Sequence, residues 1–65
     1  MKPITGPEMC RLIENDGWRL RRISGSHHIY SKPGEQKVIS VPVHGSKPLK
    51  SGLAAKIAKD TGIHL

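Results

Sequence analysis

The sequence predicts a small α+β fold with the element order α-β-β-β-α. Two observations predict this order. Apolar residues have helical spacing near the two ends of the chain, and the segment between them alternates with the period of two that strands require. The 65 residues suffice for one thin hydrophobic core, so we expect residues 1–65 to form a single domain.

The first helix is expected from about Pro7 to Asp16. Thr5 and Glu8 have the spacing of a capping box, and the proline falls in the first turn, where no N–H donor is needed. Gly17 provides the stop signal. The apolar stripe of this helix contains Met9, Cys10, Leu12 and Ile13. A single cysteine cannot form an internal disulfide, and we expect Cys10 to be a reduced core residue.

Three strands are expected to follow, over about residues 18–23, 26–31 and 37–43. In the first of them Trp18 and Leu20 alternate with arginines, which gives the strand a basic face. The Pro33-Gly34 pair is a strong turn signal between the second and third strands. Pro42 lacks a ladder donor and should therefore lie at a sheet edge or near the end of its strand.

The last helix is expected from about Leu49 to Asp60, because Leu49, Leu53 and Ile57 fall on one side of it. Each helix then has one apolar face, and the sheet needs one of its faces covered. We therefore expect a three-stranded antiparallel sheet with the two helices side by side on the same face. That layout is the double-stranded-RNA-binding-domain type of α+β architecture.

The composition favours an anionic partner. Eleven Lys and Arg against five Asp and Glu give a net charge of +6, and nucleic acid is the most natural ligand for so basic a chain. An ordinary solvated basic surface is the alternative. No apolar run is long enough for a signal peptide or a membrane span, so we expect a soluble cytoplasmic protein that contacts no membrane.

Three stretches of the chain form a family pattern when they are taken together. They are Glu14-Asn15-Asp16-Gly17-Trp18, then Gly25-Ser26-His27-His28-Ile29-Tyr30, and then Val41-Pro42-Val43-His44-Gly45 leading to residues 47–53. In this order and spacing they resemble the HicA toxins of HicA/HicB toxin–antitoxin systems, and the likeness covers about residues 7–63. Members of that family are small mRNA interferases with a double-stranded-RNA-binding-like fold, held inactive by a HicB antitoxin.

The resemblance implies a metal-independent endoribonuclease that cleaves mRNA, acts on single-stranded RNA without a cofactor, and is neutralised by a HicB-like antitoxin. The family's catalytic histidine directly follows a Gly-Ser pair, which assigns that role to His27. His44 falls in the family's Val-Pro-x-His-Gly segment and is a second position of interest. Ser46 and Pro48 replace a more usual glycine and a more usual acidic residue, and the catalytic position is intact.

A histidine suits this chemistry because RNA carries its own nucleophile, the 2′-hydroxyl. Cleavage needs a group that takes this proton near neutral pH, where an unperturbed imidazole titrates. If the second and third strands pair across their turn, His27 comes near Val41 to His44. His44 then either completes an acid–base pair or only orders its loop. The histidine and cysteine spacing does not match a zinc site, and no metal is expected.

Strand alternation separates the two adjacent histidines. If Ile29 and His27 face the helices, then His28 and Tyr30 lie on the opposite, more exposed side of the sheet. There Tyr30 can stack on a base and His28 can contact phosphate. Five basic side chains are further candidates for contacts with RNA phosphates, each with an ordinary solvated charge as the alternative: Arg19, Arg21, Arg22, Lys47 and Lys50.

Two other functional classes remain open on the sequence alone. One is a non-catalytic RNA-binding module of the same fold, whose histidines only recognise RNA. The other is a purely protein-binding partner of an acidic protein. A substitution of His27 discriminates the enzyme from both, because only an enzyme needs that imidazole for cleavage.

Overall fold

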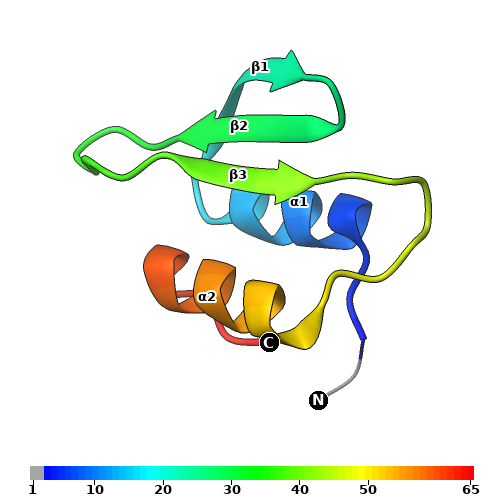
Figure 1. Ribbon diagram of the computed structural model, residues 1–65. Helices are drawn as coiled ribbons and strands as arrows, with labels where there is room; N and C mark the ends of the chain where they lie inside the picture. The colour runs from blue at the N-terminus through cyan, green and yellow to red at the C-terminus, as the bar shows by residue number, and fades with distance from the viewer. Residues whose placement is uncertain (1–2) are drawn as a thin grey trace.

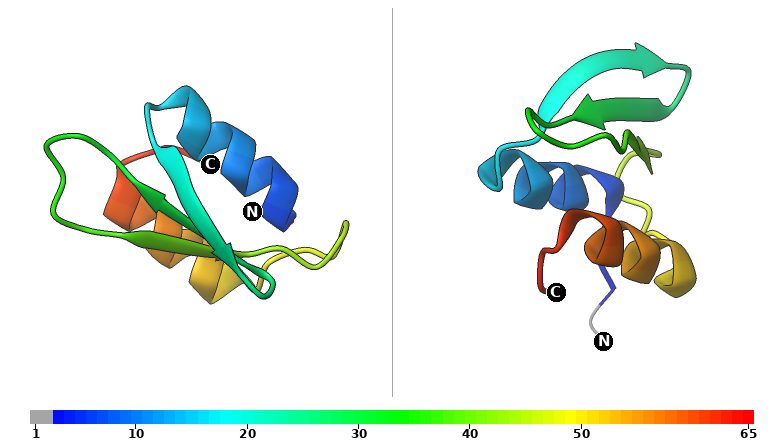
Figure 2. Two further views of the ribbon diagram at one scale, coloured as in Figure 1. Left: turned by 90° about the horizontal axis from the view of Figure 1, so that it is seen from above. Right: turned by 90° about the vertical axis from the view of Figure 1, so that its left-hand side faces the viewer.

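The computed structural model describes residues 3–65, which form two helices and a three-stranded antiparallel sheet (Figure 1). The elements are α1 (Gly6–Asn15), β1 (Arg19–Ser24), β2 (His27–Ser31), β3 (Ile39–Pro42) and α2 (Ser51–Thr61). Both helices lie under the same face of the sheet (Figure 2). The predicted α+β class and the order α-β-β-β-α are therefore confirmed.

Helix α1 begins at the predicted capping box. The backbone N–H of Thr5 donates to the Glu8 carboxylate (2.9 Å), and the backbone N–H of Glu8 donates to the Thr5 hydroxyl (3.2 Å). These two bonds satisfy donors that the first helical turn cannot pair internally. At the other end Gly17 adopts φ +99°, a left-handed conformation that suits glycine, and the chain turns into β1.

Strand β2 is central, with β1 and β3 at the edges of the sheet. Its register pairs Tyr30 with Ile39 and His28 with Val41. Tyr30, Ile39 and Val41 are at most 4% exposed, so this side of β2 and β3 packs on the helices. Ile29 therefore faces away from the helices, so the condition under which His28 and Tyr30 would lie on the more exposed side is not met.

The core lies between the sheet and the two helices. Its largest fully buried side chains are those of Met9, Ile13, Tyr30 and Val41. Cys10 is a free thiol and 7% exposed, as predicted, and burial raises its pKa. Pro42 is the last residue of an edge strand, which also confirms its predicted position.

Strand β1 departs from simple alternation. Its register with β2 shifts between Leu20 and Arg22, so that Arg21 is an extra residue in the strand. Arg19 and Arg22 consequently share the outer face of the sheet, opposite Ser31 and Ile29. Strict alternation along this strand would have placed Arg21, not Arg22, on the same face as Arg19, so the predicted basic face is corrected accordingly. All six residues of β1 are exposed.

Gly6 lies where α1 approaches the end of β3. A Cβ at this buried position would stand 2.4 Å from the Pro42 carbonyl oxygen and 3.0 Å from the Val43 Cα. We expect Gly6→Ala to lower the free energy of unfolding by about 1–3 kcal/mol, since the backbones must move apart. Urea denaturation measures the change.

Gly52→Ala is the matched control for this substitution. Gly52 lies in the first turn of α2, and a Cβ there would meet no heavy atom within 4 Å. We expect it to raise the stability by roughly 0.5–1 kcal/mol, the usual gain from replacing a helical glycine by alanine. Equal losses of stability in the two variants would contradict the close contact at Gly6.

Candidate active site

His27 is the first residue of β2 and follows a two-residue turn. Gly25 opens this turn with φ +61°, the conformation that a type II′ turn requires at its first position, and Ser24 then pairs with His27. The imidazole is exposed on the outer face of the sheet, opposite Pro42 in the register. The Gly-Ser-His sequence is thus a turn that presents a histidine to solvent at the start of a strand.

Ser40 orients this histidine. Its hydroxyl lies 3.2 Å from Nδ1 of His27, diagonally across β2 and β3. A serine hydroxyl can accept from an Nδ1–H and can also donate to an unprotonated Nδ1. This contact therefore fixes the ring plane in either tautomer and directs Nε2 away from Ser40.

His44 reaches the same end of the sheet from the loop after β3. The backbone N–H of Val43 donates to the Ser26 carbonyl (2.7 Å), and Nε2 of His44 lies 3.5 Å from the Ser26 hydroxyl. The predicted pairing that brings this segment to His27 is confirmed. The two imidazoles hydrogen-bond to different serines, so a joint acid–base role for His44 stays a prediction.

A groove runs between β3 and α2 and includes His27 in its wall. Its volume is about 360 Å³. Residues of both elements and of the start of β2 line it, among them His27, Ser40, Leu53, Lys56 and Asp60. The groove therefore connects the candidate catalytic histidine with a helix that is distant in the sequence.

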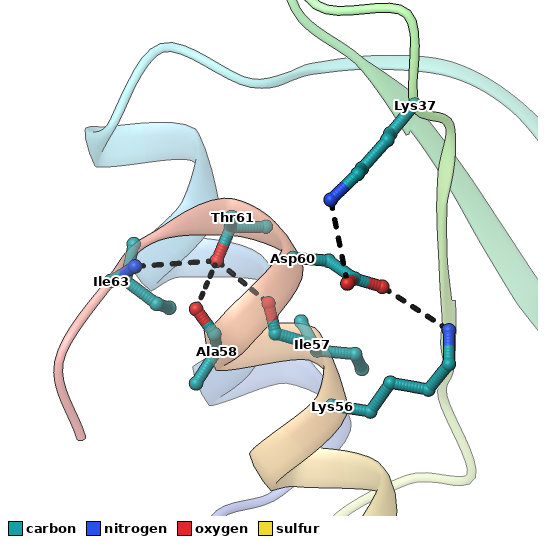
Figure 3. Close-up of polar contacts among 7 residues, drawn as sticks. All are labelled: Lys37, Lys56, Ile57, Ala58, Asp60, Thr61 and Ile63. Atoms are coloured by element: carbon teal, nitrogen blue, oxygen red, sulfur yellow. Dashed lines mark hydrogen bonds and ion pairs between the residues drawn. The ribbon is translucent and has the colours of Figure 1, made fainter.

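An acidic residue of α2 holds two lysines beside this groove (Figure 3). The Asp60 carboxylate accepts from Nζ of Lys56 (3.1 Å) and lies 3.7 Å from Nζ of Lys37, which precedes β3. The hydrogen bond from Lys56 lowers the pKa of the Asp60 carboxyl, and the charges of Lys56 and Lys37 act in the same direction. The cluster carries one net positive charge.

The predicted RNA-binding cations occupy two parts of the surface. Arg19, Arg21 and Arg22 are exposed on β1, whereas Lys47 and Lys50 are exposed in the segment that leads to α2. The backbone N–H of Lys47 donates to the His44 carbonyl (3.0 Å), which keeps this lysine in the turn beside the second histidine. Their contacts with RNA stay predictions.

Tyr30 and His28 lie on the helix-facing side of the sheet and not on the exposed side where their predicted roles placed them. Tyr30 is 1% exposed and its hydroxyl donates to the Glu14 carboxylate, so the expectation that its ring stacks on a base is wrong. His28 lies on the same helix-facing side and is half-buried, whereas His27 is exposed. His28 is thus the less accessible of the pair, and its contact with phosphate remains a prediction.

Sequence reasoning missed Ser40, Lys37, Lys56 and Asp60. Ser40 was detectable as the polar residue between the buried Ile39 and Val41, and Lys56 and Asp60 have the i, i+4 spacing of a helical ion pair. The meeting of α2 with His27 has no local signal, because it depends on how the helix packs against β3.

Among residues 3–65, no three side chains of His, Cys, Asp or Glu gather in a way that could hold a metal ion. The helices of this part of the chain are too short and too polar to cross a bilayer.

Comparison with known proteins identifies the family. No curated protein matches the chain significantly. A family model described as "HicA toxin of bacterial toxin-antitoxin" matches residues 6–63. The match includes both helices, the three strands, the Gly-Ser-His turn and the loop that carries His44. The chain therefore belongs to the HicA family of toxins from bacterial toxin–antitoxin systems.

Proposed function

We propose that this HicA toxin is a metal-independent endoribonuclease that cleaves mRNA and thereby blocks translation, with His27 as the residue that transfers the proton. The observation that carries the proposal is the setting of His27. The imidazole is exposed at the start of a strand, is oriented by Ser40 at 3.2 Å, and lies beside a groove that contains a lysine.

The chemistry of the proposal uses the RNA's own 2′-hydroxyl. Nε2 of His27 takes the hydroxyl proton, the 2′ oxygen attacks the adjacent phosphorus, and the bond from phosphorus to the 5′ oxygen breaks. The departing 5′ oxygen takes up a proton, and the products are a 2′,3′-cyclic phosphate and a 5′-hydroxyl end. His44 is the candidate proton donor, since its ring lies at the same end of the sheet.

Binding of single-stranded RNA is proposed to use the exposed cations of β1 and of the segment before α2. Arg19 and Arg22 share the outer face of the sheet with His27, and Lys47 neighbours His44. The net charge of +6 gives these contacts a favourable long-range field. Arg21, Lys50 and His28 are proposed as additional phosphate contacts.

Membership in a toxin–antitoxin family implies an antitoxin as the natural protein partner. We propose that this partner is HicB-like and that it neutralises the toxin by preventing RNA from reaching His27. An exposed imidazole on an open sheet face is accessible to such a protein.

The decisive experiment is cleavage of a defined RNA by the purified protein, with and without EDTA. We expect cleavage at the same rate in both conditions, and we expect no cleavage of an oligonucleotide of the same sequence with 2′-deoxyribose at every position. Products should carry cyclic phosphate ends.

Three other outcomes would overturn parts of this proposal. Tight RNA binding without cleavage would indicate a non-catalytic binding module. Cleavage that EDTA abolishes and zinc restores would refute the metal-independent mechanism. Cleavage of the 2′-deoxy oligonucleotide would refute the role of the 2′-hydroxyl.

A further inference from the structure

The groove between β3 and α2 is lined by hydrogen-bond donors and by one carboxylate, that of Asp60, which pairs with Lys56 and with Lys37 beside the groove. Three of its side chains carry hydrogen-bond donors, namely the His27 imidazole, the Ser40 hydroxyl and the Lys56 ammonium. Its volume of about 360 Å³ lies at the lower end of the roughly 300–1,000 Å³ that small-ligand sites occupy. Apolar Leu53 forms part of the wall.

The ammonium groups beside the groove are paired with Asp60 and remain accessible to solvent. Lys56 and Lys37 both pair with Asp60, yet their side chains are 72% and 61% exposed. Exposed ion pairs add little to the stability of a fold. The cluster nevertheless places two ammonium groups beside a single carboxylate, which leaves one positive charge unbalanced.

The outer face of the sheet provides a path from β1 to this groove. Arg22 pairs with Ile29, and Ile29 pairs with Ser40, so these three residues form one row across the strands. Two strand spacings separate Arg22 from Ser40, a distance of roughly 10 Å. His27 lies in the adjacent row, between Ser24 and Pro42. An RNA strand that crosses this face next to His27 would meet the groove at β3, where Ser40 and Pro42 line it.

We infer that the groove between β3 and α2 binds a phosphate of the RNA backbone and that Lys56 is the side chain that contacts it. The inference rests on the proposed ribonuclease function and adds a binding site on the α2 side of His27, distinct from the cations of β1 and of the segment before α2. An RNA phosphate fits better than an acidic side chain because Ser40 and His27 bring the reacting centre to the same wall.

The test compares Lys56→Gln with Lys59→Gln. Lys59 lies on the same helix and is exposed, but it does not line the groove. Its substitution therefore removes the same charge from α2 without changing the lining of the groove. Affinity is measured by fluorescence anisotropy with a 2′-deoxy-substituted RNA that cannot be cleaved, over a range of salt concentrations. Cleavage of the unmodified RNA is followed in parallel under single-turnover conditions.

We expect Lys56→Gln to weaken binding by about 10-fold and to reduce the salt slope by roughly 0.7, the value for one lost contact with a single strand. Lys59→Gln should change affinity by less than about 3-fold, and Lys56→Arg should retain it, because a cation remains. Circular dichroism and thermal melts of the variants verify that all are folded.

Equal effects of Lys56→Gln and Lys59→Gln would overturn this inference and leave the proposed ribonuclease function standing. Loss of affinity for an antitoxin in Lys56→Gln, with RNA affinity unchanged, would also overturn it, in favour of a protein-docking groove. If the wild type binds but never cleaves RNA, the proposed function fails, whereas the anisotropy comparison still decides whether Lys56 contacts phosphate.

Discussion

Replacement of His27 by alanine is expected to reduce RNA cleavage by about 10²- to 10⁴-fold, the usual contribution of a positioned general acid or base. The reason is geometric as well as chemical. The ring is exposed, and Ser40 orients it at 3.2 Å so that Nε2 can meet a 2′-hydroxyl. Cells that express the variant should grow normally with intact mRNA, whereas the wild type should arrest growth.

His28→Ala is the matched control for this substitution, since it removes the adjacent imidazole. Because His28 lies on the helix-facing side of β2, we expect its loss to change the cleavage rate by less than about 10-fold, well below the effect of a general base. His44→Ala should fall between the two if His44 donates the second proton. Equal activity of His27→Ala and the wild type, with both proteins folded, would remove His27 from the mechanism.

Local signals in the sequence predicted most of the fold. The Thr5–Glu8 capping box, the left-handed glycine after α1 and the strand-ending Pro42 each depend on chemistry within a few residues. Such features follow from backbone geometry and hydrogen-bond donors that any chain with these residues shares. Pairing of β2 with β3 then followed from the short connection between them.

Local signals did not predict which side chains of β2 point toward the helices. Alternation separates Ile29 from Tyr30, but a period of two does not say which of them meets the helices. The buried hydroxyl of Tyr30 finds its acceptor on Glu14, which lies 16 positions earlier in the chain. A polar tip that is satisfied at such a distance has no signature within its own strand.

Some residues of the candidate site were likewise predictable from local signals, and others depend on tertiary packing. Family resemblance indicated His27, which directly follows the Gly-Ser turn. Strand pairing indicated that His44 approaches it, because the β2–β3 register brings the end of β3 beside the start of β2. Lys37 and Asp60 meet only after α2 has packed against β3. The extra residue Arg21 in β1 likewise reflects the twist and pairing of the finished sheet.

Tyr30→Ala is expected to lower the free energy of unfolding by about 3–5 kcal/mol, the usual cost of removing a large aromatic ring from a core. Tyr30 is 1% exposed and packs in a core that holds one other aromatic residue, Trp18, so little else can fill the space. Urea denaturation followed by Trp18 fluorescence measures the loss. A folded Tyr30→Ala protein with normal stability and weakened RNA binding would contradict the buried position.

Tyr30→Phe isolates the hydroxyl. The hydrogen bond to Glu14 is lost, but the exposed carboxylate can be solvated again, so the expected cost is about 1–2 kcal/mol. The phenol also makes stability depend on pH, because burial, together with hydrogen bonds involving Cys10 and Glu14, raises the pKa of Tyr30 well above its ordinary value.

The sign of this dependence follows from proton linkage. The folded state keeps the proton that the unfolded state releases above about pH 10, so the contribution of Tyr30 is complete below that pH and is lost as the pH rises further. Since the chain has one tyrosine, phenolate absorbance reports this group alone. We expect phenolate to appear only when the protein unfolds and Trp18 becomes exposed. In Tyr30→Phe, stability should fall less steeply at alkaline pH than in the wild type. Ionisation of Tyr30 near pH 10 in a fully folded protein would refute the buried hydrogen bond.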